Sequence, residues 1–356
     1  MTKAHQIDKN LRVTMFSSAT KVAGQGVGSA YIELIRLLER DATDSLTIHE
    51  NSLKKSHIAH YHTIDFHFFL STFFTKRFNR RIGYVHFLPE TLRQSITLPE
   101  PIFRVFCGYV MKFYKRMDHL VVVNPDFVEK LVALKIPREK ITYIPNFVAK
   151  DKWYRLPQKT IDEFRKEKNI PKKQFVVLGA GQIQERKGVA DFVELAKRHP
   201  DLKFIWAGGF SFGRITDGYD KFKKIVENPP KNVTFTGIIS REEMMKFYNA
   251  ADLFLLPSFN ELFPMSILEA CSCGTPVMLR DLDLYHNILA GKYIPVKDLD
   301  EMDKQLKKIL EKPTILDKYR KLSAEVSAEY SEEALCETWK AFYKEQHILT
   351  TKNKSS

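Results

Sequence analysis

The chain of 356 residues contains few cysteines and no long apolar run. Four cysteines in a chain of this length do not provide a disulfide framework. No stretch of about 18 uninterrupted apolar residues is present, which argues against a membrane span. The first residues, MTKAHQIDKNLRV, lack the apolar core of a signal peptide. We therefore expect a protein of the reducing cytoplasm.

The sequence also lacks a pattern typical of a metal site. Cys271 and Cys273 are one residue apart on an apolar segment, which favours packing over metal binding. Asp-x-Asp occurs at Asp281–Asp283 and at Asp298–Asp300, but both copies follow predicted strands, where turn and capping roles suffice. The sequence predicts no metal requirement and no cofactor.

Acidic residues are scarce in the first 150 residues, which hold 13 Asp and Glu against 22 Lys and Arg. Between Lys76 and Arg116, nine basic residues stand among aromatic side chains, with only two acidic ones. Such a surface favours an anionic partner, either lipid or nucleic acid. A basic nucleic-acid-binding protein is therefore one alternative, and comparing salt-dependent binding to duplex DNA and to anionic vesicles separates the two.

Apolar runs alternate with helical patterns along the whole chain, and their Val, Ile, Leu and Phe content is typical of parallel strands covered on both faces. They indicate two α/β domains at 1–150 and 173–330, joined by a charged linker at 151–172. We expect strands at Leu11–Ser17, Ser45–His49, His57–His62, Ile82–Phe87, Leu120–Asn124, Ile141–Pro145, Phe175–Ala180, Lys203–Ala207, Val233–Thr236, Leu253–Pro257, Pro276–Leu279 and Tyr293–Pro295. Two facing domains of this type would bind a ligand between the C-terminal ends of their strands.

The stretch NELFPMSILEACSCGTPV, residues 260–277, places Glu261 before a predicted helix and Glu269 within it. Pro264 suits the first turn of a helix, and Gly274 suits its end. Free backbone amides at the start of such a helix favour an anion. Two acids beside these amides suggest a polyhydroxylated phosphate compound as the ligand.

These motifs resemble those of retaining sugar-nucleotide glycosyltransferases of family 4, which have the GT-B architecture. The resemblance implies two Rossmann-like doubly wound α/β domains that face each other across a cleft, with a C-terminal helix at 331–347 crossing back to the first domain. It extends from about Arg12 to Phe342. It rests, in the order of the family, on GQGVGSAYIELIRLL, YVHF, ITYIPNFVAKDKWY, GAGQIQERKG, VTFTGIISREEMMKFYNAADLFLLPS, the E-x7-E stretch and YSEEALCETW.

The resemblance assigns roles to individual residues. The catalytic candidates are His86 and Glu261, which would contact the transferred sugar, and Lys187, which would neutralise the diphosphate together with Arg186. Glu269 would bind the nucleotide ribose. The remaining donor-binding candidates are Gly26 and Gly28 of the early glycine loop, Gly237 and Ile238 near the base, and Phe263, Met265 and Ser266, whose amides would face the sugar.

The chain departs from the family at two places. The family usually has arginine at the position of Gln182, and Arg186 is our candidate substitute. The family commonly reads E-G-F-G where this chain reads Glu261-Leu262-Phe263-Pro264. Two glycines are lost, so the preferred sugar stays open.

The implied reaction is transfer of a hexose from a UDP-sugar with retention of configuration. No carboxylate of the first domain stands out as a nucleophile. The resemblance therefore favours front-face displacement, in which the departing phosphate accepts the proton of the acceptor.

The segment from Phe66 to Arg116 carries the prediction of the acceptor. Phe103, Phe106, Val110 and Phe113 recur at helical spacing and predict one apolar helix face flanked by basic residues. Apolar and basic side chains together suggest an interfacial surface on an anionic membrane. The membrane-binding candidates are Arg80, Arg81, Arg104, Lys112, Lys115 and Arg116.

The stretch VHFLPETLRQSITLPEPIF also resembles bacterial diacylglycerol glycosyltransferases, particularly those that add a second sugar to monoglucosyl-diacylglycerol. This resemblance implies a peripheral enzyme on the inner face of the cell membrane that extends a glycolipid, with glucose as the expected sugar. A soluble or polyprenyl-linked saccharide is the alternative acceptor. The linkage and the oligomeric state stay open.

Overall fold

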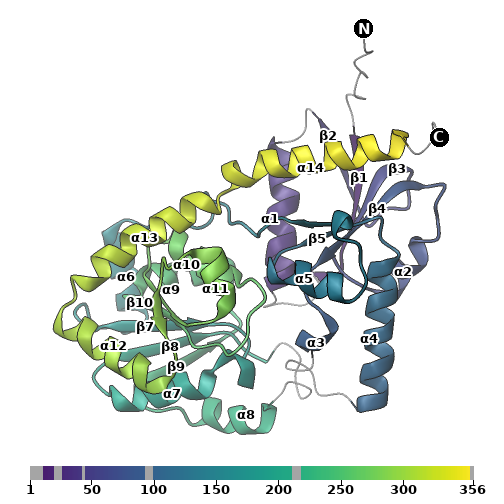
Figure 1. Cartoon of the computed structure of the whole chain (residues 1–356). Coiled ribbons are helices and arrows are strands. Elements are labelled where there is room, and N and C mark those ends of the chain that lie inside the picture. The colour runs from purple at the N-terminus through teal and green to yellow at the C-terminus, as the bar shows by residue number, and fades with distance from the viewer. Residues whose placement is uncertain (1–10, 20–25, 42–44, 93–98, 211–217, 353–356) are drawn as a thin grey trace.

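A computed structural model of the chain describes residues 11–19, 26–41, 45–92, 99–210 and 218–352. These residues form two α/β domains, each built on a six-stranded parallel sheet. The domains stand side by side in Figure 1, with the first in purple and blue and the second in teal and green. The predicted fold class is confirmed.

The first sheet has the strand order β2-β1-β3-β4-β5-β6. Its strands are β1 (Leu11–Phe16), β2 (Leu46–Glu50), β3 (Ser56–Tyr61), β4 (Phe78–Val85), β5 (His119–Val122) and β6 (Ile141–Tyr143). Its helices are α1 (Gly26–Asp41), α2 (Phe66–Ser71), α3 (Pro89–Leu92), α4 (Glu100–Lys115) and α5 (Asp126–Ala133), with a short 3-10 helix η2 (Arg138–Lys140) before β6.

The second sheet has the order β12-β11-β10-β7-β8-β9. Its strands are β7 (Val176–Ala180), β8 (Lys203–Ala207), β9 (Val233–Gly237), β10 (Leu253–Leu256), β11 (Val277–Arg280) and β12 (Ile294–Val296). Its helices are η3 (Glu185–Lys187), α7 (Val189–Arg198), α8 (Tyr219–Glu227), α9 (Arg241–Ala250), α10 (Met265–Ser272), α11 (Asp283–Leu289), α12 (Leu299–Glu311) and α13 (Ile315–Glu329).

The strands form where the apolar runs predict them, because central parallel strands are covered on both faces. Every residue of β5 and β10 is buried, for example. The largest difference is at β4, which begins at Phe78 rather than Ile82. The strand accommodates Arg80 and Arg81 because both side chains find partners.

Those partners correct the expectation that Arg80 and Arg81 face a membrane. Arg81 donates to both carboxylate oxygens of Asp118, each at 2.9 Å, and is only 21% exposed. Arg80 donates to the side-chain oxygen of Gln346 at 2.9 Å. Both guanidinium groups therefore hold the first domain together.

The segment expected as a linker, residues 151–172, contains a helix that belongs to the second domain. Helix α6 (Gln158–Glu167) packs on α9 of the second domain, with Ile161 and Phe164 buried. The ring of Phe164 lies 5.0 Å from that of Phe247, edge to face. Residues 158–167 therefore belong to the second domain's packing.

The end of the chain returns to the first domain. Helix α14 (Glu332–Lys352) continues from α13 and packs against α1, β3 and β4. Figure 1 shows α13 and α14 in yellow, running along the top from one domain to the other. Trp339 and Tyr343 are fully buried, and the hydroxyl of Tyr343 lies 2.8 Å from Nδ1 of His60.

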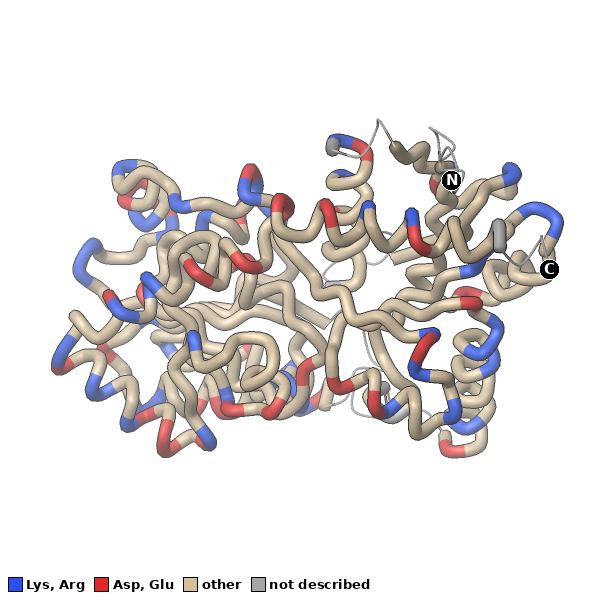
Figure 2. Tube along the Cα trace, turned by 45° about the horizontal axis from the view of Figure 1, so that its top comes forward, with Lys and Arg blue, Asp and Glu red and all other residues tan. Residues whose placement is uncertain are grey.

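The charges are unevenly distributed over the two domains. In Figure 2, blue and red segments alternate around the second domain on the left, whereas blue predominates at the far right end of the first domain. The basic excess that the sequence shows in residues 1–150 therefore lies largely at the outer end of the first domain.

Candidate active site

A cavity of about 440 Å³ lies between the two domains. From the first domain it is lined by the start of α1 and by residues directly after β4, β5 and β6, such as His86 and Asn146. From the second domain it is lined by the loops after β7, β8, β9 and β10 and by the start of α10. The C-terminal ends of both parallel sheets thus meet at one site, as such sheets predict.

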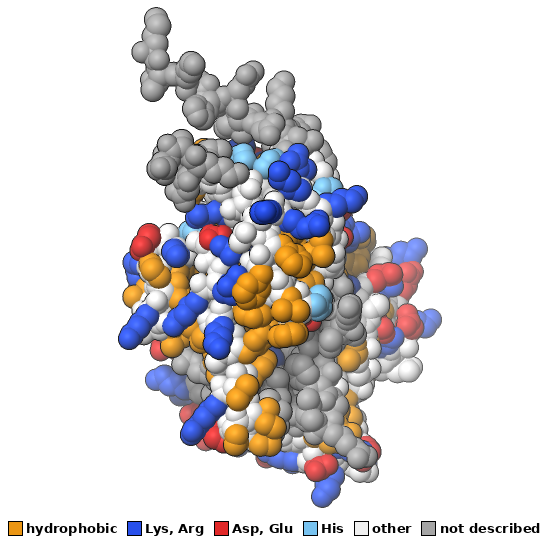
Figure 3. All heavy atoms as spheres, turned by 90° about the vertical axis from the view of Figure 1, so that its right-hand side faces the viewer, with side chains coloured by type: hydrophobic (Ala, Val, Ile, Leu, Met, Phe, Trp, Pro, Cys, Tyr) orange, Lys and Arg blue, Asp and Glu red, His pale blue; other side chains and the backbone are white. Residues whose placement is uncertain are grey.

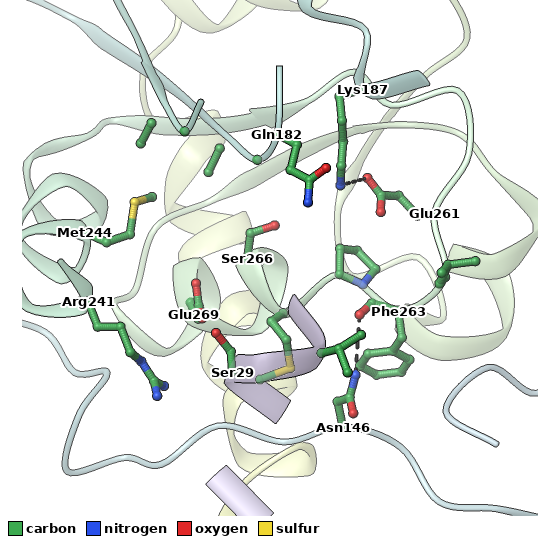
Figure 4. Close-up of a pocket in the computed structure, with 18 of the residues that line it drawn as sticks. Ser29, Asn146, Gln182, Lys187, Arg241, Met244, Glu261, Phe263, Ser266 and Glu269 are labelled. Carbon is green, nitrogen blue, oxygen red and sulfur yellow. Dashed lines mark hydrogen bonds and ion pairs between the residues drawn. The ribbon is translucent and has the colours of Figure 1, made fainter. Parts of the chain in front are cut away.

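A buried ion pair forms one wall of this cavity (Figure 4). Nζ of Lys187 lies 2.6 Å from Oε1 of Glu261, and the residues are 9% and 8% exposed. Burial lowers the pKa of Lys187. Burial alone would raise the pKa of Glu261, but the charges of Lys187 and Arg186 outweigh it and hold this pKa below its ordinary value. The low pKa of Glu261 keeps this carboxylate ionised at neutral pH beside Lys187.

Glycines allow the loops that carry this pair to approach each other. A Cβ atom at Gly188 would lie 2.2 Å from the carbonyl oxygen of Pro257, and Gly188 has a φ of +67°. A Cβ atom at Gly208 would lie 2.0 Å from the carbonyl oxygen of Gly181. Any larger residue at either position would push the loops after β7, β8 and β10 apart.

The loop after β7 supplies two further polar side chains. Arg186 donates to the carbonyl oxygen of Asn260 at 3.1 Å and lies 3.8 Å from Glu261. Gln182 lines the cavity, and its side-chain oxygen accepts a hydrogen bond from Gln184 at 2.9 Å. Figure 4 shows the side chain of Gln182 beside Lys187. Arg186 and Gln182 therefore both belong to the wall next to the ion pair.

Helix α10 carries the second glutamate, as predicted. It begins at Met265, with Pro264 as the residue before its first turn, and it ends before Gly274, whose φ is +74°. Glu269 accepts a hydrogen bond from the hydroxyl of Tyr248 at 2.9 Å. Burial raises the pKa of Glu269 to about 7, although the charge of Arg241 and the bond from Tyr248 oppose this rise.

The residues brought together here match most of the prediction. His86, Arg186, Lys187, Ile238, Glu261, Phe263, Met265, Ser266 and Glu269 all line the cavity. Gly26, Gly28 and Gly237 are not among the described residues that line it. Gly28 instead allows close packing, because a Cβ atom there would lie 2.9 Å from the carbonyl oxygen of Ala19. Gly24 lies outside the described residues.

Sequence reasoning missed Arg241, the first residue of α9. Its guanidinium lines the cavity, pairs with Glu33 of α1 and lies over the ring of Trp153. Glu33 is fully buried and also accepts a hydrogen bond from the backbone N–H of Ala149 at 3.2 Å. Ser240 caps α9, so the sequence indicates where this helix begins. The partner of Arg241, Glu33, lies 208 residues away and could not be predicted from the sequence.

His86 stands at the end of a group of buried aromatic rings. The ring of Tyr84 lies 4.3 Å from that of His86, and His62 lies 6.2 Å away. Burial lowers the pKa of His86 to about 3, so the imidazole is neutral. Its Nε2 atom has no hydrogen-bond partner among the described residues. A neutral ring of this kind can donate or accept one hydrogen bond to a ligand.

Of the Asp-x-Asp segments, Asp298 has the capping role expected of it, whereas Asp281 bonds to a tyrosine side chain of the same domain. Asp298 caps α12 by accepting a hydrogen bond from the N–H of Glu301 at 2.9 Å. Asp281 accepts a hydrogen bond from the hydroxyl of Tyr293 at 2.6 Å. Within the described ranges, no group of three or more His, Cys, Asp or Glu side chains is arranged to hold a metal ion.

The surface around α2 and α4 differs from the predicted one. Phe103, Val110 and Phe113 are buried. Val110 and Phe113 belong to the apolar cluster of the first domain, and the half-buried Phe106 packs against it. The exposed apolar residues on this side are instead Phe66, Leu70, Phe73, Phe74, Ile102 and Val105, which we call the outer apolar surface. Figure 3 shows orange apolar side chains gathered beside blue basic ones at this end of the molecule.

Four of the membrane-binding candidates lie at or beside this outer apolar surface. Arg104, Lys112 and Lys115 are exposed on α4. Arg116 lies over the ring of Phe73, with 3.7 Å from its guanidinium carbon to the ring centre, and donates to Thr72. Across the part of the chain that the structure describes, no helix combines the length and apolar character needed to cross a membrane.

Known proteins resemble this chain in sequence and in fold. Residues 160–327 match the family model for glycosyl transferases group 1. The chain is 53% identical over 344 residues to alpha-galactosylglucosyldiacylglycerol synthase of Streptococcus pneumoniae, an alignment that covers 97% of this chain and 92% of that protein.

Two solved structures share the fold at low sequence identity. Sucrose-phosphate synthase from Thermosynechococcus elongatus superposes with a TM-score of 0.75 at 16% identity, over 95% of this chain and 100% of that one. HepE of Anabaena, solved in complex with UDP-glucose, gives a TM-score of 0.71 at 14% identity, over 96% of this chain and 100% of that one.

Proposed function

The chain belongs to the group 1 glycosyl transferases, and from that premise we propose that it transfers a hexose from a UDP-sugar to a glucosyl-diacylglycerol. The observation that carries this proposal is the 53% identity to a glycosyldiacylglycerol synthase over nearly the whole chain. The cavity also supports the proposal, because it is lined by the carboxylates of Glu261 and Glu269, by the cations Arg186 and Lys187 and by the start of helix α10.

The donor occupies the second-domain side of the cavity in this proposal. The ribose hydroxyls donate to Glu269, and the base lies near Ile238. Lys187 and Arg186 offset the charge that develops on the departing diphosphate, which a buried cation does more strongly than one in water. Glu261 accepts hydrogen bonds from the sugar, and the neutral His86 contacts it from the first domain.

The transferred sugar is galactose or glucose. The name of the pneumococcal relative specifies an α-galactosyl group on glucosyl-diacylglycerol, which favours UDP-galactose. HepE was solved with UDP-glucose, and glucose is also the sugar expected from the sequence. A UDP-hexose of this type is α-linked at C1, so an α-linked product means retention.

We further propose front-face displacement. The acceptor hydroxyl attacks C1 on the side from which the diphosphate departs, the bond between C1 and the phosphate oxygen breaks, and that oxygen takes the hydroxyl proton. Among the described cavity residues the carboxylates are Glu261 and Glu269, both from the second domain. This composition supports a mechanism without a first-domain nucleophile.

The acceptor is met at a membrane in this proposal. The outer apolar surface would enter the boundary between headgroups and acyl chains, with Arg104, Lys112 and Lys115 facing anionic headgroups. The enzyme would then work as a peripheral protein on the cytoplasmic face of the membrane, where UDP-sugars are available.

Release of the nucleoside diphosphate from UDP-galactose, UDP-glucose and GDP-sugars tests the function, with glucosyl-diacylglycerol, diacylglycerol or methyl glucoside as acceptor. We expect turnover with a UDP-hexose and glucosyl-diacylglycerol, and an α-linked product. Turnover on methyl glucoside alone would assign the enzyme to soluble saccharides, and an inverted product would exclude front-face displacement.

A further inference from the structure

The loop that carries Glu261 extends one apolar side chain, Leu262, from the second domain to the first. The residues on either side of it are buried, with Glu261 at 8% and Phe263 at 6% exposure. Leu262 is half-buried and lines the cavity. It packs against an apolar cluster whose other described members all lie between residues 16 and 143.

That cluster extends from the cavity to the outer apolar surface. Phe87 packs against it and also lines the cavity. On the outer side, Phe69 and Tyr109 pack against it, with ring centres 5.5 Å apart. The exposed Phe66 lies 6.5 Å from each of these two rings. The cluster therefore joins the wall beside Glu261 to the surface where we place the lipid.

We propose that Leu262 is a specificity-determining residue that selects an acceptor sugar attached to an acyl glycerol. This inference rests on the proposed function and adds the residue that recognises the lipid part. The side chain of Leu262 offers no hydrogen bond next to the catalytic Glu261. A further sugar at this wall would have hydroxyl groups without hydrogen-bond partners. A glycerol ester with acyl chains has no hydroxyl group there and loses no hydrogen bond.

A further observation favours this occupant. The outer end of the cluster is flanked by the exposed cations Arg104, Lys112 and Lys115, which complement anionic lipid headgroups. This arrangement points to a lipid-linked sugar.

Binding of the acceptor tests this inference independently of turnover. Protein saturated with UDP is titrated with a fluorescent short-chain glucosyl-diacylglycerol, for the wild type, Leu262→Ser and Leu262→Met. We expect Leu262→Ser to bind the glycolipid about tenfold more weakly and Leu262→Met to bind it like the wild type. Affinity for the UDP-sugar should be unchanged in both. Leu282→Ser is the matched control, because Leu282 is also half-buried but lies away from the cavity lining.

Equal affinity of Leu262→Ser and the wild type for the glycolipid would overturn the inference. Turnover is measured separately, as the ratio of kcat/KM on glucosyl-diacylglycerol to that on methyl glucoside. If the wild type binds the glycolipid through Leu262 but transfers no hexose to it, the proposed function fails while the inference stands. If the wild type transfers the hexose and Leu262→Ser keeps both the affinity and the ratio, the inference alone fails.

Discussion

Lys187 and Glu261 form a buried ion pair, 2.6 Å from nitrogen to oxygen, that connects the loop after β7 to the loop after β10. Because both residues are more than nine-tenths buried, water screens their attraction weakly. Removal of either partner leaves an uncompensated charge inside the protein. The pair therefore connects these two loops at the wall of the cavity and contributes buried charge there.

We expect Lys187→Ala to lower turnover at least tenfold, because the diphosphate loses its buried cation. The measurement is the initial rate of UDP release at saturating donor and acceptor. Lys197→Ala is the control, since Lys197 is exposed and pairs only with Glu194 on the same helix. Circular dichroism establishes that the variant is folded. An unchanged rate in a folded Lys187→Ala protein would contradict the assignment of the donor site.

Donor affinity should rise with pH through neutrality. Ribose hydroxyls donate to the ionised form of Glu269, whose pKa burial raises to about 7. Affinity for UDP-glucose, which does not itself titrate near this pH, should be about tenfold lower at pH 6 than at pH 8. Isothermal titration calorimetry measures it. The affinity of Glu269→Gln for the donor should depend only weakly on pH. If its affinity changed with pH as steeply as that of the wild type, a group other than Glu269 would be responsible.

Glu269 should also affect the stability of the fold, which should fall with rising pH while donor affinity rises. Between its ordinary pKa of 4.5 and about 7, the folded protein retains a proton on Glu269 that the unfolded chain releases. The contribution of Glu269 to stability therefore falls as the pH rises through this window. Comparing urea unfolding of the wild type and Glu269→Gln at pH 5 and pH 8 measures this contribution.

The triple variant Arg104→Ser, Lys112→Ser, Lys115→Ser should bind phosphatidylglycerol vesicles about 100-fold more weakly, at about 1 kcal/mol for each basic residue. Co-sedimentation measures vesicle binding. The affinity of the variant for UDP-glucose should equal that of the wild type if the donor site is intact. Replacement of the exposed Lys197, Lys223 and Lys307 of the second domain with serine is the matched control. Undiminished sedimentation of the triple variant would place the membrane surface elsewhere.

Arg81→Ser should act on stability and not on membrane binding. It removes the two-point contact with Asp118, in which both side chains are less than a third exposed. We expect the free energy of unfolding to fall by about 1–2 kcal/mol. Urea unfolding measures this loss, and vesicle binding of the folded fraction should match the wild type. Wild-type stability combined with lost vesicle binding would restore Arg81 to the membrane surface.

Turnover should not depend on a divalent metal ion, because the cations next to the diphosphate are Lys187 and Arg186. Rates in excess chelator and in magnesium chloride should agree within about twofold. A rate that falls in chelator and returns with one added metal would show that the diphosphate needs more than these side chains.

The sequence predicts the sheets and the second-domain wall of the cavity because local patterns determine them. Strand positions follow from buried apolar runs, and α10 follows from Pro264 and Gly274 at its two ends. The loops after β7 and β10 carry their functional residues within a few positions of those strands. Parallel topology then brings the C-terminal ends of the strands together.

Pairings between distant segments could not be predicted in this way. Arg81 is a basic residue in a basic stretch, and only the fold brings Asp118 beside it. The apolar spacing of α4 is correct, but it marks the buried face rather than an exposed one. Arg241 meets Glu33 across the two domains. In each case the partner is set by tertiary packing, which a local pattern does not encode.

Helix α14 makes the first domain dependent on residues that follow the second domain in the chain. Until this helix emerges, His60 lacks the hydroxyl of Tyr343, and Arg80 lacks Gln346. At a translation speed of 5–20 residues per second, the second domain takes roughly 10–40 s to follow the first out of the ribosome. The first domain is therefore completed only after the second has been synthesised, and a chain shortened before α14 lacks these contacts of its first domain.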